Sequence, residues 1–166
     1  IRARTWRGSD LIGDHLALND VVISRGSLAR VVRLRTRIDG NLLTTYVADG
    51  VIVSTPTGST AYALAAGGPI LPPELRNMLL LPIAPHMSLN RPIVLARDAT
   101  VKIGVRTDHQ AILTVDGQFE VELESGDEIE VSSADHTSLF IRLGSRAYFY
   151  DTLLARMAPK PIADEY

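Results

Sequence analysis

The stretch DGVIVSTPTGSTAYALAAGGP, Asp49–Pro69, joins an apolar run to a short alanine-rich run through a turn crowded with small hydroxyl residues. Its first part, VIVST, is typical of a buried strand, and Pro56 with Gly58 predicts a turn directly after it. The next part, TAYALAA at Thr60–Ala66, predicts a short helix that two glycines and a proline end. The chain therefore brings a helix N-terminus to the end of a strand.

A helix N-terminus carries unpaired backbone N–H groups and a partial positive charge, and the hydroxyls of this turn can add donors and acceptors around it. Such an arrangement suits phosphate, ribose or amide groups. The stretch lacks the lysine of a GxxxxGK[ST] phosphate loop, so it is not that loop. The same residues also fit a tight strand-to-helix junction in which Ser59 or Thr60 only caps the helix. From the residues alone, both interpretations stay open.

Most of the remaining sequence predicts short strands, because runs rich in Val, Ile, Leu and Thr alternate with Gly, Asp, Asn or Pro. Asp39-Gly40 and Asp116-Gly117 each predict a tight hairpin turn. A second short helix is expected at 150–157. These features predict a mainly β fold, with two antiparallel sheets in a sandwich-like arrangement. The predicted strands are 3–6, 20–24, 28–38, 42–48, 51–55, 92–96, 100–107, 111–123, 128–133 and 138–144.

Composition narrows the class of protein. The 166 residues suffice for one ordinary domain, and the net charge of -2 with scattered Lys and Arg argues against a nucleic-acid partner. The absence of cysteine fits a reducing compartment, so we expect a cytoplasmic protein. The apolar run at Met78–Ala84 is far shorter than the roughly 20 residues of a membrane-spanning helix, so we expect no membrane association.

Four motifs together resemble the NAD kinase family. The block ADGVIVSTPTGSTAYALAAGGPI at 48–70 is similar to the family signature. It is accompanied by ALNDVVISRG at 17–26, PIAPHMSLNRPIVL at 82–95 and VDGQ at 115–118, in the family's order. The resemblance implies an enzyme that transfers a phosphoryl group from ATP or polyphosphate to the adenosine-ribose 2′-hydroxyl of NAD, giving NADP.

The resemblance also implies a two-domain plan. An N-terminal α/β domain would carry a GGDGT loop with the catalytic aspartate, and this chain matches only the C-terminal β-rich domain. Because GGDGT does not occur in the sequence, we expect no catalytic residue here and no activity from this part alone. The resemblance implies that a divalent ion, Mg²⁺, accompanies ATP on its phosphate oxygens, so no metal ligand is assigned. A homodimer or homotetramer is implied, with neighbouring subunits contributing to each pocket.

Carried over residue by residue, the resemblance implies a set of NAD-binding positions. Asn19 and Asp20 would face the adenosine half, and Asp49 would read amino or carboxamide hydrogens. On the residues alone, each position also has an ordinary structural interpretation as a turn, a solvated strand residue or a core residue. The implied set is Asn19, Asp20, Arg30, Asp49, Thr60, Ala61, Tyr62, Ala63, Leu64, Ala65 and Gln118, with His86 beside the pocket.

Two other functions remain alternatives. A lipid or sphingoid-base kinase shares the two-domain plan, although the complete TPTGSTAY block argues against it. A noncatalytic nucleotide-binding or assembly domain is the alternative outside enzymes. Two positions depart from the family pattern. Asp20 stands where many family members carry glutamate, which shortens the reach of the carboxylate by one methylene. Val47 stands where some members carry a polar or basic residue.

Overall fold

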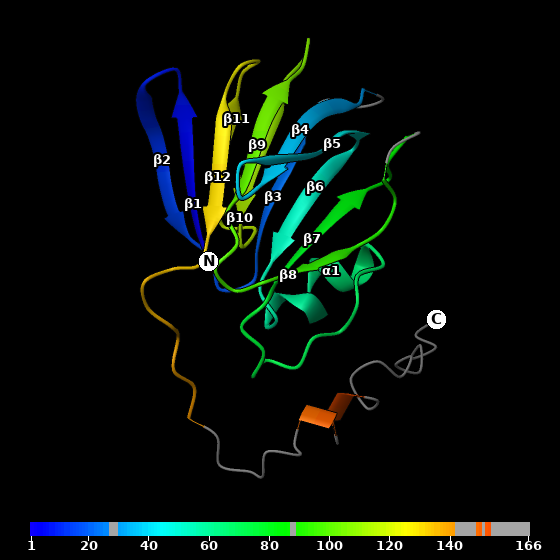
Figure 1. The fold of residues 1–166 in the computed structure, drawn as a ribbon, viewed down its shortest axis with the longest axis vertical. Coiled ribbons are helices and arrows are strands. Elements are labelled where there is room, and N and C mark those ends of the chain that lie inside the picture. Colours follow the sequence, from blue (N-terminus) through cyan, green and yellow to red (C-terminus); the bar gives the residue numbers. More distant parts are fainter. Residues whose placement is uncertain (27–29, 87–88, 142–148, 151, 154–166) are drawn as a thin grey trace, which may run out of the picture.

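The computed structural model describes residues 1–26, 30–86, 89–141, 149–150 and 152–153. Two six-stranded antiparallel sheets pack face to face as a sandwich (Figure 1). Both the mainly β fold and the two-sheet arrangement predicted from the sequence are thereby confirmed.

The first sheet is open to solvent on its outer face. Its order is β2 (Asp10–Leu16), β1 (Arg2–Arg7), β12 (Glu128–Ser132), β9 (Val101–Arg106), β4 (Val32–Ile38) and β5 (Asn41–Ala48). Buried and more exposed residues alternate along β1, β4, β9 and β12, as expected for strands with one face in the core.

The second sheet is buried on both faces at its centre. Its order is β11 (Phe119–Leu123), β10 (Ala111–Val115), β3 (Asp20–Arg25), β6 (Gly50–Ser54), β7 (Met78–Ile83) and β8 (Ile93–Leu95). The inner faces of β3, β6 and β7 enter the core between the sheets, whereas Val22, Ile52 and Leu81 pack on the outer side against Ala63 and Leu71. This double burial explains why these strands are continuous apolar runs rather than alternating ones.

Two strands were not predicted. In β2, DLIGDHL, a glycine, two aspartates and a histidine interrupt the apolar pattern, and most of this edge strand is exposed. β7, MLLLPI, belongs to the apolar run at Met78–Ala84 and contains a proline, a residue that is rarely found inside a sheet. Pro82 is tolerated because β8 pairs only with residues 78–80 of β7, so no neighbouring strand requires an N–H from Pro82 on that side.

The strand predicted at 138–144 is wrong for the residues that the structure describes. Residues 138–141 form no strand, and Leu139 and Ile141 are almost fully exposed, so no described surface buries their apolar side chains. The remainder of that prediction lies outside the described residues.

Both hairpin predictions are confirmed. Asp39 and Gly40 have φ values of 50° and 80°, and Asp116 and Gly117 have values of 50° and 63°. These are the positive values that a two-residue reversing turn requires. The two turns join β4 to β5 and β10 to β11.

The helical part after β6 is shorter than predicted. A 3₁₀ turn at Gly58–Thr60 (η1) precedes a single α-helical turn at Tyr62–Ala65 (α1). The predicted Ser59 or Thr60 cap is wrong, since Ala61 is the N-cap residue and no side chain caps α1. Gly67, at φ 84°, does follow the helix as predicted. The second predicted helix, at 150–157, falls mostly outside the described residues. Within the described part of the chain, no helix is long and apolar enough to cross a membrane.

Candidate functional site

The loop before β3 is held by the carboxylate of Asp116. The backbone N–H of Leu18 donates to Asp116 Oδ2 at 2.7 Å, and those of Asn19 and Asp20 donate to Oδ1 at 2.7 and 3.0 Å. The backbone N–H of Asp116 in turn donates to the carbonyl of Asp20 at 2.9 Å. A carboxylate that accepts three backbone N–H groups forms charge-assisted hydrogen bonds with each of them and thereby stabilises this conformation of the loop.

The same loop is fastened to the turn that follows β6. The carbonyl oxygen of Asn19 accepts from the Thr55 N–H at 2.8 Å and from Ser54 Oγ at 3.0 Å. Thr55 Oγ1 donates to the carbonyl of Leu18 at 2.6 Å and accepts from the Gly58 N–H at 3.0 Å. The Asn19 loop and the TPTGST turn therefore form one hydrogen-bonded unit.

The small hydroxyls of the turn mainly serve this internal fastening. Ser59 is buried, and its Oγ donates to the carbonyl of Pro56 at 2.7 Å and accepts from the Leu71 N–H at 2.9 Å. The hydroxyls of Ser54 and Thr55 are also engaged with the backbone, as described above. Because α1 is only one turn long, its dipole adds little for an anion. The junction interpretation thus accounts for most of the hydroxyls, and the exposed residues beyond them form the surface available to a ligand.

Those exposed residues begin at Thr60. Thr60, Ala61 and Ala65 are exposed, and the Tyr62 side chain is 48% exposed. Ala63 is fully buried on the outer side of the second sheet and serves packing there. Leu64 is half-buried, between these two groups.

Gln118 belongs to the same end of the sheet. It is exposed and follows the Asp116-Gly117 turn, whose carboxylate holds the Asn19 loop. Its backbone N–H donates to the carbonyl of Val115 at 3.0 Å. The sequence-implied residues Asn19, Asp20, Gln118 and the segment from Thr60 to Ala65 are thus associated with one end of β6.

Asp20 is the buried acid of this group. It is 6% exposed and pairs with Ser54 across β3 and β6. Burial raises the pKa of Asp20, and the negative charge of Asp116 raises it further. The Asp20 carboxyl therefore holds a proton more readily than an ordinary aspartate and can act as a donor as well as an acceptor.

A second group of the implied residues lies at the opposite end of β6. Asp49 precedes β6, and its carboxylate pairs with Arg25, with Nε to Oδ1 at 3.0 Å. The exposed His86 donates its backbone N–H to the carbonyl of Val47 at 2.7 Å. Arg30 is exposed just before β4, whose first residue pairs with Ala48.

The two groups are separated by the length of β6. In Figure 1, β6 points toward α1, and the turn that precedes β6 lies at the far end of the sheet. From Asp49 to Thr55 there are six residue steps, so the two ends lie about 20 Å apart in an extended strand. Within one chain, the structure does not bring Asp49 together with Tyr62.

Two residues important to this arrangement were not recognised from the sequence. Asp116 appeared only as part of a turn, although an aspartate at a positive-φ position leaves its carboxylate free to reach a neighbouring loop. Arg25 carried no signal, since its pairing with Asp49 depends on the order of the strands.

Among the described residues, no group of three or more His, Asp or Glu side chains is placed to hold a metal ion.

Comparison with known proteins places this arrangement in a family. Residues 18–143 match the family described as ATP-NAD kinase C-terminal domain. The chain is 48% identical over 157 residues to an NAD kinase of Chloroflexus aurantiacus, covering 95% of this chain and 57% of that protein. It is 46% identical to an NAD kinase of Citrifermentans bemidjiense, covering 90% of this chain and 52% of that protein. The chain thus spans a little over half the length of these relatives.

Solved structures agree with the sequence comparison. A yeast NADH kinase complexed with NADH superposes with a TM-score of 0.74 at 36% identity, over 79% of this chain and 38% of that chain. An NAD kinase from Archaeoglobus fulgidus in complex with ATP superposes with a TM-score of 0.71 at 29% identity, over 88% and 56%. On the fold, the match over 18–143 and these relatives, the chain belongs to the ATP-NAD kinase family, of which it carries the C-terminal domain.

Proposed function

We propose that this chain is the dinucleotide-binding part of an NAD kinase, which phosphorylates the adenosine-ribose 2′-hydroxyl of NAD with ATP or polyphosphate as donor. The observation that carries the proposal is the Asn19 loop, held by Asp116 and fastened to the turn that leads to the exposed Thr60–Tyr62 segment. Relatives solved with NADH and with ATP support the choice of ligands.

In this proposal the chain positions the acceptor. The Asn19 side chain can donate and accept, the Asp20 carboxyl can bond a ribose hydroxyl, and the Tyr62 ring offers a flat face to a base. Phosphoryl transfer depends mainly on such positioning and on charge neutralisation, so a rigid binding loop contributes directly to rate. We assign no proton acceptor to this chain and propose that a GGDGT segment outside it supplies one.

A divalent ion would accompany the phosphoryl donor. We propose that Mg²⁺ enters on the phosphate oxygens of ATP, because phosphoryl transfer requires their charge to be neutralised and oxygen atoms are the ligands that Mg²⁺ prefers.

The position of Asp49 supports an oligomeric enzyme. If Asp49 contacts the same dinucleotide as Tyr62, a second copy of the chain must bring it, since the two lie at opposite ends of β6. We propose a homodimer or homotetramer in which Asp49, with Arg30 and His86 near it, faces the Tyr62 end of a neighbouring subunit.

The binding role of Tyr62 is tested by Tyr62→Ala in the full-length protein. Loss of base stacking is worth about 1–3 kcal/mol, so we expect the KM for NAD to rise by a factor between about 5 and about 150. The melting temperature should not change, because the side chain is 48% exposed. Leu42→Ala, which truncates another exposed side chain on the β4–β5 hairpin, is the matched control and should change neither quantity. Unchanged NAD kinetics in Tyr62→Ala, or turnover of diacylglycerol in place of NAD, would contradict the proposal.

The shared pocket is tested by complementation. Tyr62→Ala and Asp49→Ala proteins, each weakly active alone, are co-expressed at equal levels. In a dimer with shared pockets, half of the molecules are hybrids with one intact pocket of two, so about a quarter of wild-type activity should return. Activity no higher than the mean of the two single variants would show that each pocket belongs to one chain.

A further inference from the structure

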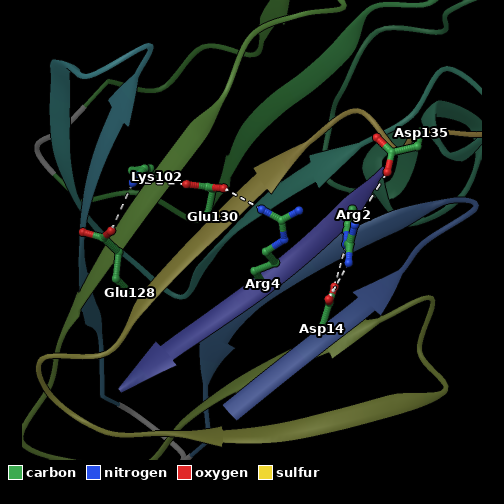
Figure 2. Close-up of polar contacts among 7 residues, drawn as sticks. All are labelled: Arg2, Arg4, Asp14, Lys102, Glu128, Glu130 and Asp135. Carbon is green, nitrogen blue, oxygen red and sulfur yellow. Dashed lines mark hydrogen bonds and ion pairs between the residues drawn. The ribbon is translucent and has the colours of Figure 1, made fainter. Parts of the chain in front are cut away.

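The outer face of the first sheet carries alternating rows of charge from β2 to β9. Arg2 pairs with Asp14 at 2.6 Å, and Arg4 pairs with Glu130 at 3.5 Å. Lys102 contacts Glu130 at 3.1 Å and Glu128 at 3.6 Å (Figure 2). In this part of the sheet, each basic row lies beside an acidic row.

The alternation ends at β4. The outward-facing residues of this strand are three arginines, and the strand pairing sets Arg37 beside Lys102 and Arg33 beside Arg106 of β9. On the other side of β4, Arg33 and Arg35 lie beside Val47 and Thr45 of β5, which carry no charge. Like charges directly opposite each other destabilise a sheet, so the stability of the sheet does not explain why basic side chains gather on β4 and β9.

The third arginine of β4 lies beside an open position. Arg35 pairs with Gly104, and a Cβ atom at position 104 would meet nothing closer than the Arg35 carbonyl oxygen at 4.0 Å. Gly104 does not have a positive φ, so the backbone does not demand glycine there. Gly104 is one of the residues that line a hollow of about 530 Å³, and its lack of a side chain leaves space there.

The lining of this hollow is predominantly basic. It includes Arg35, Arg37, Lys102 and Arg106 against two carboxylates, Asp127 and Glu128. Asp127 is already neutralised by Arg7, at 2.9 Å, and Glu128 faces Lys102. Within the described part of the chain, Arg35, Arg37 and Arg106 form no ion pair.

We propose that this hollow is a binding site for an oligophosphate chain, separate from the dinucleotide surface. Guanidinium groups bind phosphate oxygens in pairs of parallel hydrogen bonds. Three guanidinium groups here have no ion-pair partner among the described residues. From Lys102 to Arg106 the cations extend over about 13 Å of strand, on rows about 5 Å apart. That strip matches two or three linked phosphoryl groups better than one phosphate ion. The site lies on the outer face of the first sheet, whereas Tyr62 and α1 lie on the second.

The test is calorimetric titration of the full-length protein with inorganic tripolyphosphate. The triple variant Arg35→Gln, Arg37→Gln and Arg106→Gln should weaken one binding event at least tenfold, and raised salt should weaken it in the unaltered protein. Its matched control replaces the exposed Arg76, Arg91 and Arg97 by Gln, which changes the net charge equally, and should leave binding unchanged. Tyr62→Ala should also leave this event unchanged.

Gly104→Glu provides a second, independent test, because it places a carboxylate on the floor of the hollow and keeps every arginine. It should abolish the same binding event with no loss of melting temperature. ATP, pyrophosphate and orthophosphate distinguish the sources. Equal affinities for ATP and tripolyphosphate would identify the phosphate chain as the recognised group. A tenfold higher affinity for tripolyphosphate would identify the free phosphate chain as the ligand, and a tenfold higher affinity for ATP would identify the nucleotide.

Three results would overturn the proposal. The first is unchanged tripolyphosphate affinity in both the arginine variant and Gly104→Glu. The second is an equal loss in the control triple variant, which would indicate a nonspecific effect of net charge. The third is a change of oligomeric mass, measured by light scattering, in the arginine variant or in Gly104→Glu without a change in tripolyphosphate affinity. That result would make this face a protein interface.

Discussion

The carbonyl oxygen of Asn19 lies against Gly58, in the space that a Cβ atom at position 58 would occupy. The carbonyl carbon and Cα of Asn19 would also clash with that atom. The loop before β3 and the turn after β6 can approach this closely only because residue 58 has no side chain. Gly58 thus sets the distance between the Asn19 loop and the Thr60–Tyr62 segment.

Gly58→Ala is expected to force these two segments apart. Because the obstacle is backbone rather than a flexible side chain, the free energy of unfolding should fall by about 1–3 kcal/mol. Urea unfolding measures the loss. Gly104→Ala is the control, since its Cβ enters open space and should cost less than about 0.5 kcal/mol. A Gly58→Ala protein as stable as the control would contradict the close packing described here.

Asp116→Asn tests the carboxylate clamp on the Asn19 loop. Asparagine tolerates the positive φ of this position but offers one acceptor oxygen and places an amide N–H₂ near a backbone donor. Loss of charge-assisted bonds to three N–H groups should cost about 1–3 kcal/mol and weaken NAD binding. Asp39→Asn is matched in turn type and φ but loses only one such bond, to the Thr100 N–H at 2.8 Å, so its effect should be smaller. Equal effects of the two variants in thermal unfolding would argue against a clamp.

Asp20 should make the folded state less stable as the pH rises. A salt-bridged acid, whose pKa is lowered, has the opposite effect. Its pKa is raised in the folded chain, so the folded state binds the proton more tightly than the unfolded state. The stability that this proton contributes is complete below the ordinary pKa of 3.8 and is lost as the pH rises from there through the raised value. Asp20→Asn should remove this loss, which urea unfolding over a pH series will show. A stability difference between the two proteins that does not change with pH would contradict the raised pKa.

Tyr46 presents a buried hydroxyl without a partner among the described residues. The side chain is fully buried in the core between the sheets, and burial raises the pKa of Tyr46 to about 12. Tyr46→Phe should therefore be neutral or stabilising by about 1 kcal/mol. Above pH 10 the unfolded tyrosine ionises before the folded one, so the wild type should lose stability there and the variant should lose less. A clear loss of stability in Tyr46→Phe at neutral pH would show that the hydroxyl has a partner.

Much of the local structure could be predicted from the sequence. The two Asp-Gly turns, most strands and the helical turn near Tyr62 depend on residues that are close in the chain, and local φ preferences and apolar runs identify them. The prediction missed two strands whose environment depends on distant parts of the chain. Both faces of β7 are covered, so its sequence is a continuous apolar run without the alternation that identifies a strand. Most of β2 is exposed, and its pairing with β1 holds it at the edge of the sheet.

The sequence by itself determined the family, because the TPTGSTAY block and its companion motifs lie in contiguous stretches, and it named the segments of the candidate site. Only the tertiary structure decided how those segments meet. Asp116 reaches Asn19 across 97 residues, Gly58 receives the Asn19 carbonyl, and Asp49 is kept apart from Tyr62 by the length of β6. The physical reason is that local residue preferences set the conformation of each strand and turn, whereas strand order and sheet packing set which of their ends come together.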